Sequence, residues 1–253
     1  MDLFDLTGKV AVITGGTRGI GLMMARGLLQ AGSSVYISSR KPEAGQAAVA
    51  ELSAYGRVAS VPADLGREEE SVRLAAEIGR LEERVHILVN NAGATWGAPL
   101  AEFPASGWDK VLDLNLKAPF FLTRAFLPLL EAAGTADDPA RVINVGSIDG
   151  LRVPGLPTYS YSASKAGLHS FAMGLRRQLR GVGIRVVEVL PPLIDTPATR
   201  SVRQPKMSTD ALVDRVLRDI RNGRDEILPG KVGLLPLLMR LAPSYAARRV
   251  AET

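Results

Sequence analysis

The sequence predicts an α/β protein in which a doubly wound parallel sheet is covered by helices on both faces, a three-layer α/β/α sandwich. Short runs rich in β-branched residues alternate with longer stretches whose apolar residues recur at three- and four-residue steps. The short runs are apolar almost throughout, which is typical of parallel strands buried on both faces. With 253 residues and 46% hydrophobic content, the chain can form one sizeable core. We therefore expect a single domain over residues 1–253.

Six apolar runs are candidate strands, and right-handed crossovers between them would give a parallel sheet. These runs are residues 10–13, 34–37, 58–61, 86–89, 142–145 and 185–190. Helical periodicity is clear over residues 21–30 and 68–81. After residue 190 prolines interrupt the pattern, and we expect a helix over residues 210–222 and a short strand over residues 226–228.

A glycine-rich turn, Thr-Gly-Gly-Thr-Arg-Gly-Ile-Gly at residues 14–21, stands between the first strand and the first helix. Gly15 permits a tight turn, Gly19 lets the backbone approach a pyrophosphate, and Gly21 allows close packing of helix and sheet. The free N–H groups and the positive dipole end of the helix would bind phosphates. The turn therefore predicts a dinucleotide site, with a purely structural glycine turn as the alternative.

The end of the second strand predicts which dinucleotide is bound. An NAD-specific protein places an acid there to bind the ribose 2′-OH, whereas this chain has Ser39 followed by Arg40. Arg18, inside the glycine turn, can reach the same point. Two guanidinium groups suit a 2′-phosphate, so we expect NADP(H) as the cofactor. The alternative for each arginine is an exposed, solubilising residue.

Further motifs follow in chain order: Asp64, the Asn-Asn-Ala-Gly stretch at residues 90–93, Asn115, Ser147, and the pair Tyr161 and Lys165. Together with the glycine turn they resemble the short-chain dehydrogenase/reductase family, which has a Rossmann fold. The resemblance covers roughly residues 7–196. Within it, residues 90–97 and 139–147 resemble 3-oxoacyl reductases of the rhamnolipid-associated type.

The resemblance implies an active site and a cofactor site. The implied catalytic residues are Asn115, Ser147, Tyr161 and Lys165. The implied cofactor contacts are Gly15, Thr17, Arg18, Gly19, Ile20, Gly21, Ser39, Arg40, Asp64, Leu65, Asn91, Ala92, Gly93, Tyr161, Lys165, Pro191, Ile194 and Thr196.

Tyr161 and Lys165 are four residues apart and share one helix face. A free tyrosine has a pKa of about 10, and an ammonium group about 4 Å away, worth up to roughly 4 kcal/mol, would lower it by at most about three units. We therefore expect a tyrosine that exchanges a proton near neutral pH, with a surface tyrosine and lysine as the alternative. Ser147 would donate to the substrate oxygen, or else cap a helix. Asn115 resembles the asparagine that holds a relay water, or makes a buried structural hydrogen bond.

Three departures from the family pattern bear on the substrate. Pro191 is followed by Pro192 where relatives have glycine, and the Asp-Gly-Gly ending of many acyl reductases is missing. The arginines with which related acyl-carrier reductases dock the carrier protein would align near Asp138 and Val182 of this chain. Their absence weakens the interpretation that the substrate is attached to an acyl carrier protein. Because loops beyond the carboxyl ends of strands bind ligands, residues 191–225 are expected to cover the substrate, ahead of a C-terminal tail at residues 232–253.

We expect an oxidoreductase that moves a hydride between NADP(H) and a small carbonyl or alcohol. The alternatives are a 3-oxoacyl thioester reductase, acting on acyl carrier protein or CoA substrates, and a non-catalytic NADP(H)-sensing scaffold. The scaffold is disfavoured because Ser147, Tyr161 and Lys165 are all retained. No metal site is expected, since His86 and His169 lack acidic partners at metal spacing and read as packing residues.

The composition of the chain limits the kinds of partner and the cell compartment that we expect. The chain has no cysteine, which excludes disulfides, and no apolar run long enough to span a membrane, so we expect a cytoplasmic protein. Residues 196–253 hold eleven Lys/Arg and six Asp/Glu, and this excess of positive charge predicts either a solvated helix face or a surface that attracts anions. No recognition motif indicates that the chain binds nucleic acid. Two largely apolar stretches, residues 118–130 and 171–173, predict a homodimer or homotetramer, because relatives pair these helices.

Overall fold

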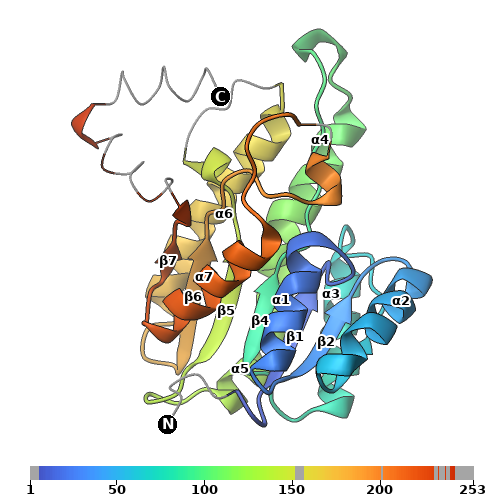
Figure 1. Ribbon diagram of the computed structural model, residues 1–253, viewed down its shortest axis with the longest axis vertical. Coiled ribbons are helices and arrows are strands. Elements are labelled where there is room, and N and C mark those ends of the chain that lie inside the picture. The colour runs from blue at the N-terminus through green and yellow to red at the C-terminus, as the bar shows by residue number, and fades with distance from the viewer. Residues whose placement is uncertain are drawn as a thin grey trace.

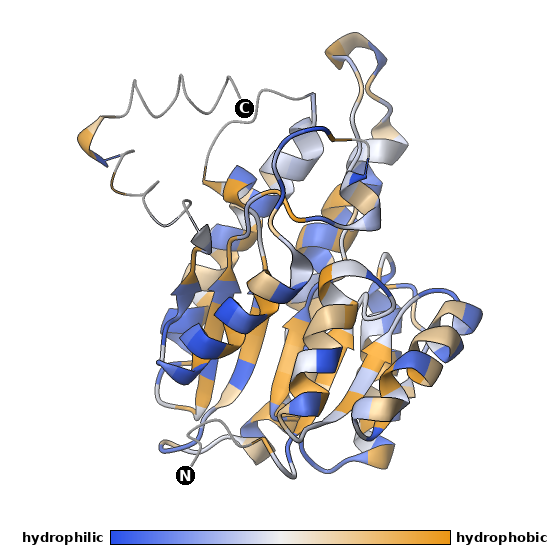
Figure 2. Cartoon of the chain, viewed as in Figure 1, coloured by the Kyte–Doolittle hydropathy of each residue, from blue (hydrophilic) through white to orange (hydrophobic). Residues whose placement is uncertain are grey.

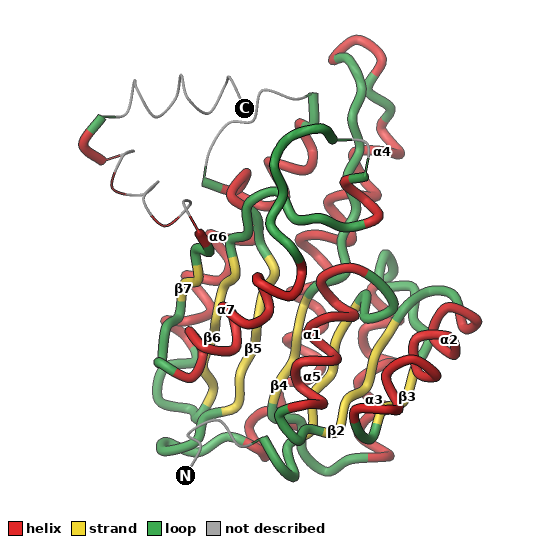
Figure 3. Tube along the Cα trace, in the orientation of Figure 1, coloured by secondary structure: helices red, strands yellow, loops and turns green. Residues whose placement is uncertain are grey.

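The computed structural model describes residues 6–151, 157–200 and 202–230 and, beyond them, residues 233, 237 and 240–242. Within these residues, seven parallel strands form one sheet in the order β3-β2-β1-β4-β5-β6-β7. Helices cover both faces, so the predicted three-layer doubly wound sandwich is confirmed (Figures 1 and 3). The strand order reverses between β1 and β4, and such a reversal opens a crevice beyond the carboxyl ends of the strands.

Each predicted strand is present, with ends that differ by only a few residues. The strands are β1 Val10–Thr14, β2 Ser34–Ser38, β3 Val58–Ser60, β4 Ile87–Asn90, β5 Ala140–Val145, β6 Ile184–Val189 and β7 Glu226–Ile227. The four central strands, β1, β4, β5 and β6, are buried almost throughout, and Figure 2 shows the sheet as a largely apolar layer. Burial on both faces explains why these strands lack an alternating polar pattern.

The helices divide the core into two layers. The helices are α1 Gly19–Gln30, α2 Pro42–Leu52, α3 Glu68–Leu81, α4 Ala105–Leu112, α5 Ala118–Ala133, α6 Tyr159–Gln178 and α7 Thr209–Arg221. Buried residues of α1, α2 and α7 pack on one face of the sheet, and buried residues of α3, α5 and α6 pack on the other. Among the described helices, none combines the length and the apolar character that crossing a bilayer requires.

The segment expected to cover the substrate, residues 191–225, divides into two parts. Residues 191–200 and 202–207 form a loop region beyond the carboxyl ends of the strands, orange in Figure 1. The following helix, α7, instead buries Leu212, Val213 and Val216 in the core layer that it shares with α1. The tail expected at residues 232–253 lies, apart from residues 233, 237 and 240–242, outside the described residues.

A row of polar side chains crosses the buried sheet. Asn90 on β4 pairs in register with Asn144 on β5, which pairs in turn with Glu188 on β6. All three residues are buried, on the face covered by α5 and α6. Asn90 Nδ2 donates to Asn144 Oδ1 at 2.8 Å and to Thr123 Oγ1 on α5 at 3.3 Å. The sheet therefore carries polar groups through an otherwise apolar layer.

His86, directly before β4, is hydrogen-bonded as a neutral ring and not simply packed. Its Nδ1 accepts a hydrogen bond from the Val10 N–H at 3.1 Å, which a protonated Nδ1 cannot do. Burial and then the nearby Lys9 ammonium lower the pKa of His86 below its ordinary value near 6.5. As the pH falls, the unfolded chain takes up a proton on His86 before the folded chain does. The stability that neutral His86 gives the folded chain is therefore fully present above pH 6.5 and is lost as the pH falls further.

We expect His86→Asn, whose Oδ1 can accept the same hydrogen bond without titrating, to flatten the acid side of the stability curve. The wild-type free energy of unfolding should fall by about 1 kcal/mol more than that of the variant between about pH 6.5 and 5, the typical net value of one hydrogen bond. Denaturant unfolding at several pH values measures this. Parallel curves for the two proteins would show that His86 does not sense pH.

Candidate active site

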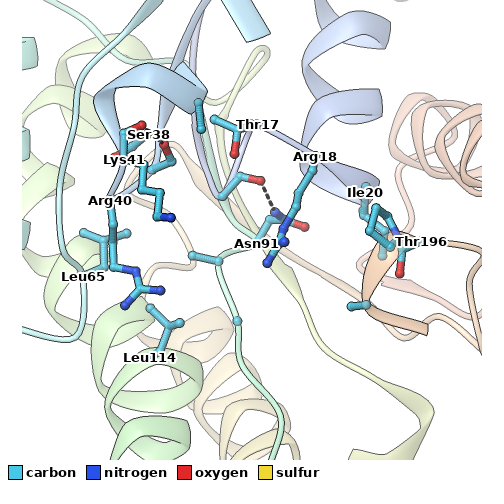
Figure 4. Close-up of a pocket in the computed structure, with 18 of the residues that line it drawn as sticks. Thr17, Arg18, Ile20, Ser38, Arg40, Lys41, Leu65, Asn91, Leu114 and Thr196 are labelled. Atoms are coloured by element: carbon cyan, nitrogen blue, oxygen red, sulfur yellow. Dashed lines mark hydrogen bonds between the residues drawn. The ribbon is translucent and has the colours of Figure 1, made fainter. Parts of the chain in front are cut away.

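A cavity of about 520 Å³ opens beyond the carboxyl ends of β1 and β2, against the N-terminus of α1 (Figure 4). Most of the predicted cofactor contacts line it. They are Gly15, Thr17, Arg18, Gly19, Ile20, Ser39, Arg40, Leu65, Asn91, Ala92, Gly93 and Thr196. The glycine turn, the end of β2 and the Asn-Asn-Ala-Gly stretch, which are far apart in the sequence, thus meet in one place.

At Gly15 and Gly19 the glycine turn presents backbone alone to the cavity. Gly15 and Gly19 have φ of +66° and +55°, values that only glycine adopts readily. A Cβ on Gly21 would lie 2.3 Å from the Gly15 carbonyl oxygen, so α1 approaches the turn as closely as the sequence predicts. Asn91 Nδ2 fixes the turn by donating to the carbonyl oxygens of Thr14 at 2.8 Å and Gly15 at 3.2 Å.

Three cations extend toward the middle of the cavity, namely Arg18, Arg40 and Lys41 (Figure 4). No acidic residue accompanies them in the described lining. Such a wall, with free helix N–H groups at one end, suits a ligand with several phosphates. Lys41 was missed by the sequence analysis, although its position directly after Arg40 signals it.

Six predicted cofactor contacts do not line this cavity; they are Gly21, Asp64, Tyr161, Lys165, Pro191 and Ile194. Gly21 packs against the Gly15 carbonyl, on the glycine turn itself. Asp64 Oδ1 accepts a long hydrogen bond from the Gly66 N–H at 3.4 Å, and the Ile194 side chain is buried in the α1/α7 core layer. Lining residues that the sequence analysis missed are mostly small or apolar, which gives no signal in a sequence: Ser38, Ala44, Ala63, Leu114, Pro197 and Ala198.

Asn115 connects this cavity to α6. It lies in η3, a single π-helical turn over Asp113–Lys117 that joins α4 to α5. Its Oδ1 accepts from the Ala94 N–H at 2.8 Å, and its Nδ2 donates to the Ala94 carbonyl at 2.9 Å and to Ser164 Oγ at 3.0 Å. Both amide hydrogens are used, so the structural role that the sequence left open is present. The cavity residue Gly93 lies beside the same amide oxygen.

Ser147, Tyr161 and Lys165 come together where β5 and α6 meet. Tyr161 and Ser147 share a side-chain hydrogen bond, and Ser147 Oγ also accepts from the Asp149 N–H at 3.1 Å as the cap of η4, a 3-10 turn over Ile148–Gly150. Lys165 Nζ lies 5.7 Å from the Tyr161 ring centroid and donates to the Val145 carbonyl at 2.7 Å. A hydroxyl, a phenol and an ammonium group are therefore neighbours.

The expected lowering of the Tyr161 pKa by Lys165 is wrong for this structure. Burial raises the pKa of Tyr161 above its ordinary value; the hydrogen bond with Ser147 opposes this, and the Asp149 carboxylate raises it further. Burial is the largest cause, and Lys165 does not offset it: its ammonium group lies over the ring, 5.7 Å from the centroid, and donates to the Val145 carbonyl. Burial also lowers the pKa of Lys165 to about 8, against the attraction of Glu188.

A sequence model of the short chain dehydrogenase family matches residues 9–207, most of the chain. The chain belongs to the short-chain dehydrogenase/reductase family. It is therefore an oxidoreductase, and the family resemblance predicted from its motifs is confirmed. The match spans the glycine turn, Ser147, Tyr161 and Lys165 and ends before α7.

Curated relatives agree with this assignment. This short-chain dehydrogenase is 43% identical over 208 residues to the rhamnolipids biosynthesis 3-oxoacyl-[acyl-carrier-protein] reductase of Pseudomonas aeruginosa, covering 82% of this chain and 81% of that protein. It is 34% identical over 232 residues to dehydrogenase/reductase SDR family member 4 of Oryctolagus cuniculus, covering 91% of this chain and 87% of that one.

Solved structures match as well. The Pseudomonas aeruginosa RhlG/NADP active-site complex superposes with a TM-score of 0.83 at 38% identity, covering 87% of this chain and 91% of that one. A short-chain dehydrogenase of Burkholderia cenocepacia, in complex with NADP, superposes with a TM-score of 0.83 at 30% identity, covering 97% and 98%. Both structures carry NADP, and both share the Rossmann architecture described above.

Proposed function

We propose that this short-chain dehydrogenase interconverts a carbonyl compound and an alcohol with NADP(H) as the hydride carrier. The observation that supports this best is the cluster of Ser147, Tyr161 and Lys165, linked through Asn115 to a cationic cavity with a glycine turn. The cavity suits a dinucleotide phosphate because Gly15 and Gly19 line it without side chains and three cations face it.

The chain's residues divide the work of binding the cofactor. The glycine turn and the N-terminus of α1 would hold the pyrophosphate, and Arg18 and Arg40 would bind the 2′-phosphate. NADPH supplies the hydride in reduction, and NADP⁺ accepts it in oxidation. Further contacts would come from Asp64 and the loop after β6, including Pro191 and Ile194.

Tyr161, Ser147 and Lys165 would handle the proton. In reduction, the carbon of the carbonyl takes the hydride and the oxygen takes a proton from the Tyr161 hydroxyl. Ser147 donates a hydrogen bond to the same oxygen as negative charge develops on it. The raised pKa of Tyr161 keeps the phenol protonated at neutral pH, the state from which it can donate. We propose that Lys165, whose ammonium group lies next to the Tyr161 ring, binds the cofactor's ribose.

A panel of small ketones, quinones and alcohols, followed by absorbance at the reduced-nicotinamide band, tests the reaction. We expect turnover with NADPH or NADP⁺ on at least one member, at several-fold higher kcat/KM than with NADH or NAD⁺. Tight NADPH binding without turnover on any carbonyl or thioester would instead support the scaffold alternative. Failure to bind NADPH would overturn the proposal.

A 3-oxoacyl thioester is the second candidate substrate. It is favoured by the 43% identity to a relative named as a 3-oxoacyl-[acyl-carrier-protein] reductase. Comparing acetoacetyl thioesters of CoA and of acyl carrier protein with small ketones separates the two. A kcat/KM at least tenfold higher for the thioesters would select this candidate.

We also propose a homodimer or homotetramer, assembled through α5 and α6. Phe120 on α5 and Met173 on α6 are 45% and 43% exposed, and Phe120 contacts Phe171 edge-on at 5.9 Å, so a shared apolar surface is available. Light scattering measures the assembly.

The loop at residues 191–207 is proposed to cover the substrate, since Thr196 to Ala198 already line the cavity. A cytoplasmic location is proposed because the chain, which lacks cysteine, shows no adaptation to an oxidising compartment.

A further inference from the structure

Glu188 is a buried carboxyl group, one strand in from the edge of the sheet, that the proposed reaction leaves unused. It lies on β6, is 0% exposed, and belongs to the polar row with Asn90 and Asn144. Its Oε2 lies 2.7 Å from Nδ1 of His169, while its Oε1 has no hydrogen-bond partner among the described residues. A carboxylate buried this deeply is costly to keep charged unless positive groups surround it.

Glu188 is linked to Lys165 in two ways, through α6 and through the end of β5. Tyr161, Lys165 and His169 follow one another at four-residue steps and so share one face of α6. Lys165 Nζ donates to the carbonyl of Val145, and the next residue, Gly146, lies against Glu188, since a Cβ there would be 3.0 Å from Oε1. The carboxyl group thus lies behind the strand end that Lys165 binds.

We propose that Glu188, held by His169, is a positioning residue that keeps Lys165 charged and in place beside Tyr161. Lys165 is 5% exposed, so water contributes little to stabilising its ammonium group. The attraction of Glu188 is what opposes the effect of burial on the Lys165 pKa. This inference rests on the proposed function only in that the charge on Lys165 matters for turnover.

Other charged groups lie near Glu188 and Tyr161. Glu188 also faces the Arg176 guanidinium on α6 and the Glu226 carboxylate on β7, which act on its pKa in opposite directions. Tyr161 faces the Asp149 carboxylate beyond Ser147. Burial raises the pKa of Glu188 and the pairing with His169 lowers it, so His169 favours the charged form that the proposal needs.

The direct test is a titration of Lys165 by NMR in the chain without cofactor, using lysine labelled with ¹³C at Cε. The chain has seven lysines, and the Lys165 signal is assigned from its loss in Lys165→Met. We expect the wild-type signal to titrate near 8 and Glu188→Gln to shift it down by roughly one unit. The matched control is Asp219→Asn, since Asp219 is a carboxylate on α7 that is 4% exposed and bonded to Arg215; it should leave the signal unmoved.

A second variant guards against misfolding of Glu188→Gln. Glu188→Met with His169→Leu replaces the pair by apolar side chains, an exchange that buried pairs often tolerate, and it should lower the titration point in the same direction. In turnover, kcat at pH 8 should fall about fivefold in both variants and change little at pH 6.5, because a one-unit shift reduces the charged fraction from about one half to one tenth.

An unmoved Lys165 signal in both folded variants overturns the proposal. So does a signal that moves equally in Asp219→Asn, because the effect would then not be specific to this carboxylate. Since the titration needs no substrate, it gives its answer even if the proposed carbonyl chemistry fails.

Discussion

Replacing Tyr161 with Phe is expected to lower kcat for carbonyl reduction by roughly 10²–10⁴-fold, the range of a positioned general acid. The ring that lies beside Lys165 is retained, and only the hydroxyl that hydrogen-bonds with Ser147 is lost. The glycine turn and the cations of the cavity are untouched, so NADPH should bind with a Kd within a few-fold of wild type. Steady-state kinetics and the fluorescence of bound NADPH measure the two quantities.

Tyr159→Phe is the matched control for this variant. Tyr159 lies on the same first turn of α6 but is 42% exposed and contacts Phe103 edge-on at 5.8 Å through its ring, which the variant keeps. We expect near wild-type turnover from it. Activity retained by Tyr161→Phe would remove Tyr161 from the role of proton donor and leave Ser147 as the nearest candidate.

Arg40→Asp is expected to reverse the cofactor preference. The change removes one of the cations that face the cavity and puts a carboxylate where an NAD-specific protein has one. Loss of a charged hydrogen bond costs about 1.5–3 kcal/mol, and repulsion of the 2′-phosphate adds to it, so the kcat/KM ratio of NADPH to NADH should fall by at least about 10²-fold. Kinetics with both cofactors on one substrate give the ratio.

Arg80→Asp makes the same charge change on an exposed residue at the end of α3 that does not line the cavity. It should leave the ratio unchanged. Should both variants alter the ratio equally, the preference would come from the overall field of the protein and not from Arg40.

The fold was predictable because its signals are local. The strands are short runs rich in apolar and β-branched residues, and the helix over residues 68–81 repeats its apolar positions with a clear period and matches α3. The glycine turn could be located because Gly15 and Gly19 adopt a conformation that other residues avoid. Even the two-residue strand β7 follows from a short apolar run after a charged helix.

The parts of the site that were missed depend on contacts between distant segments. Glu188 and His169 belong to different elements, and nothing in either stretch of sequence signals that they meet at 2.7 Å. The expected effect of Lys165 on Tyr161 failed because sequence spacing gives the helix face and not the direction of a long side chain. The ammonium group is bound by a backbone carbonyl on β5, which no residue type specifies.

The π-helical turn around Asn115 limits how the α4–α5 segment of this chain can be redesigned. A turn of this kind holds one residue more than the regular helix would, and turns of this kind are frequent at functional sites. Shortening the segment by one residue would restore the regular helix, yet would rotate every later side chain on α5 by about 100° relative to those before it. Improving the helix and preserving the link from Ala94 to Ser164 are therefore opposing aims, and a stabilised variant should be sought elsewhere in the fold.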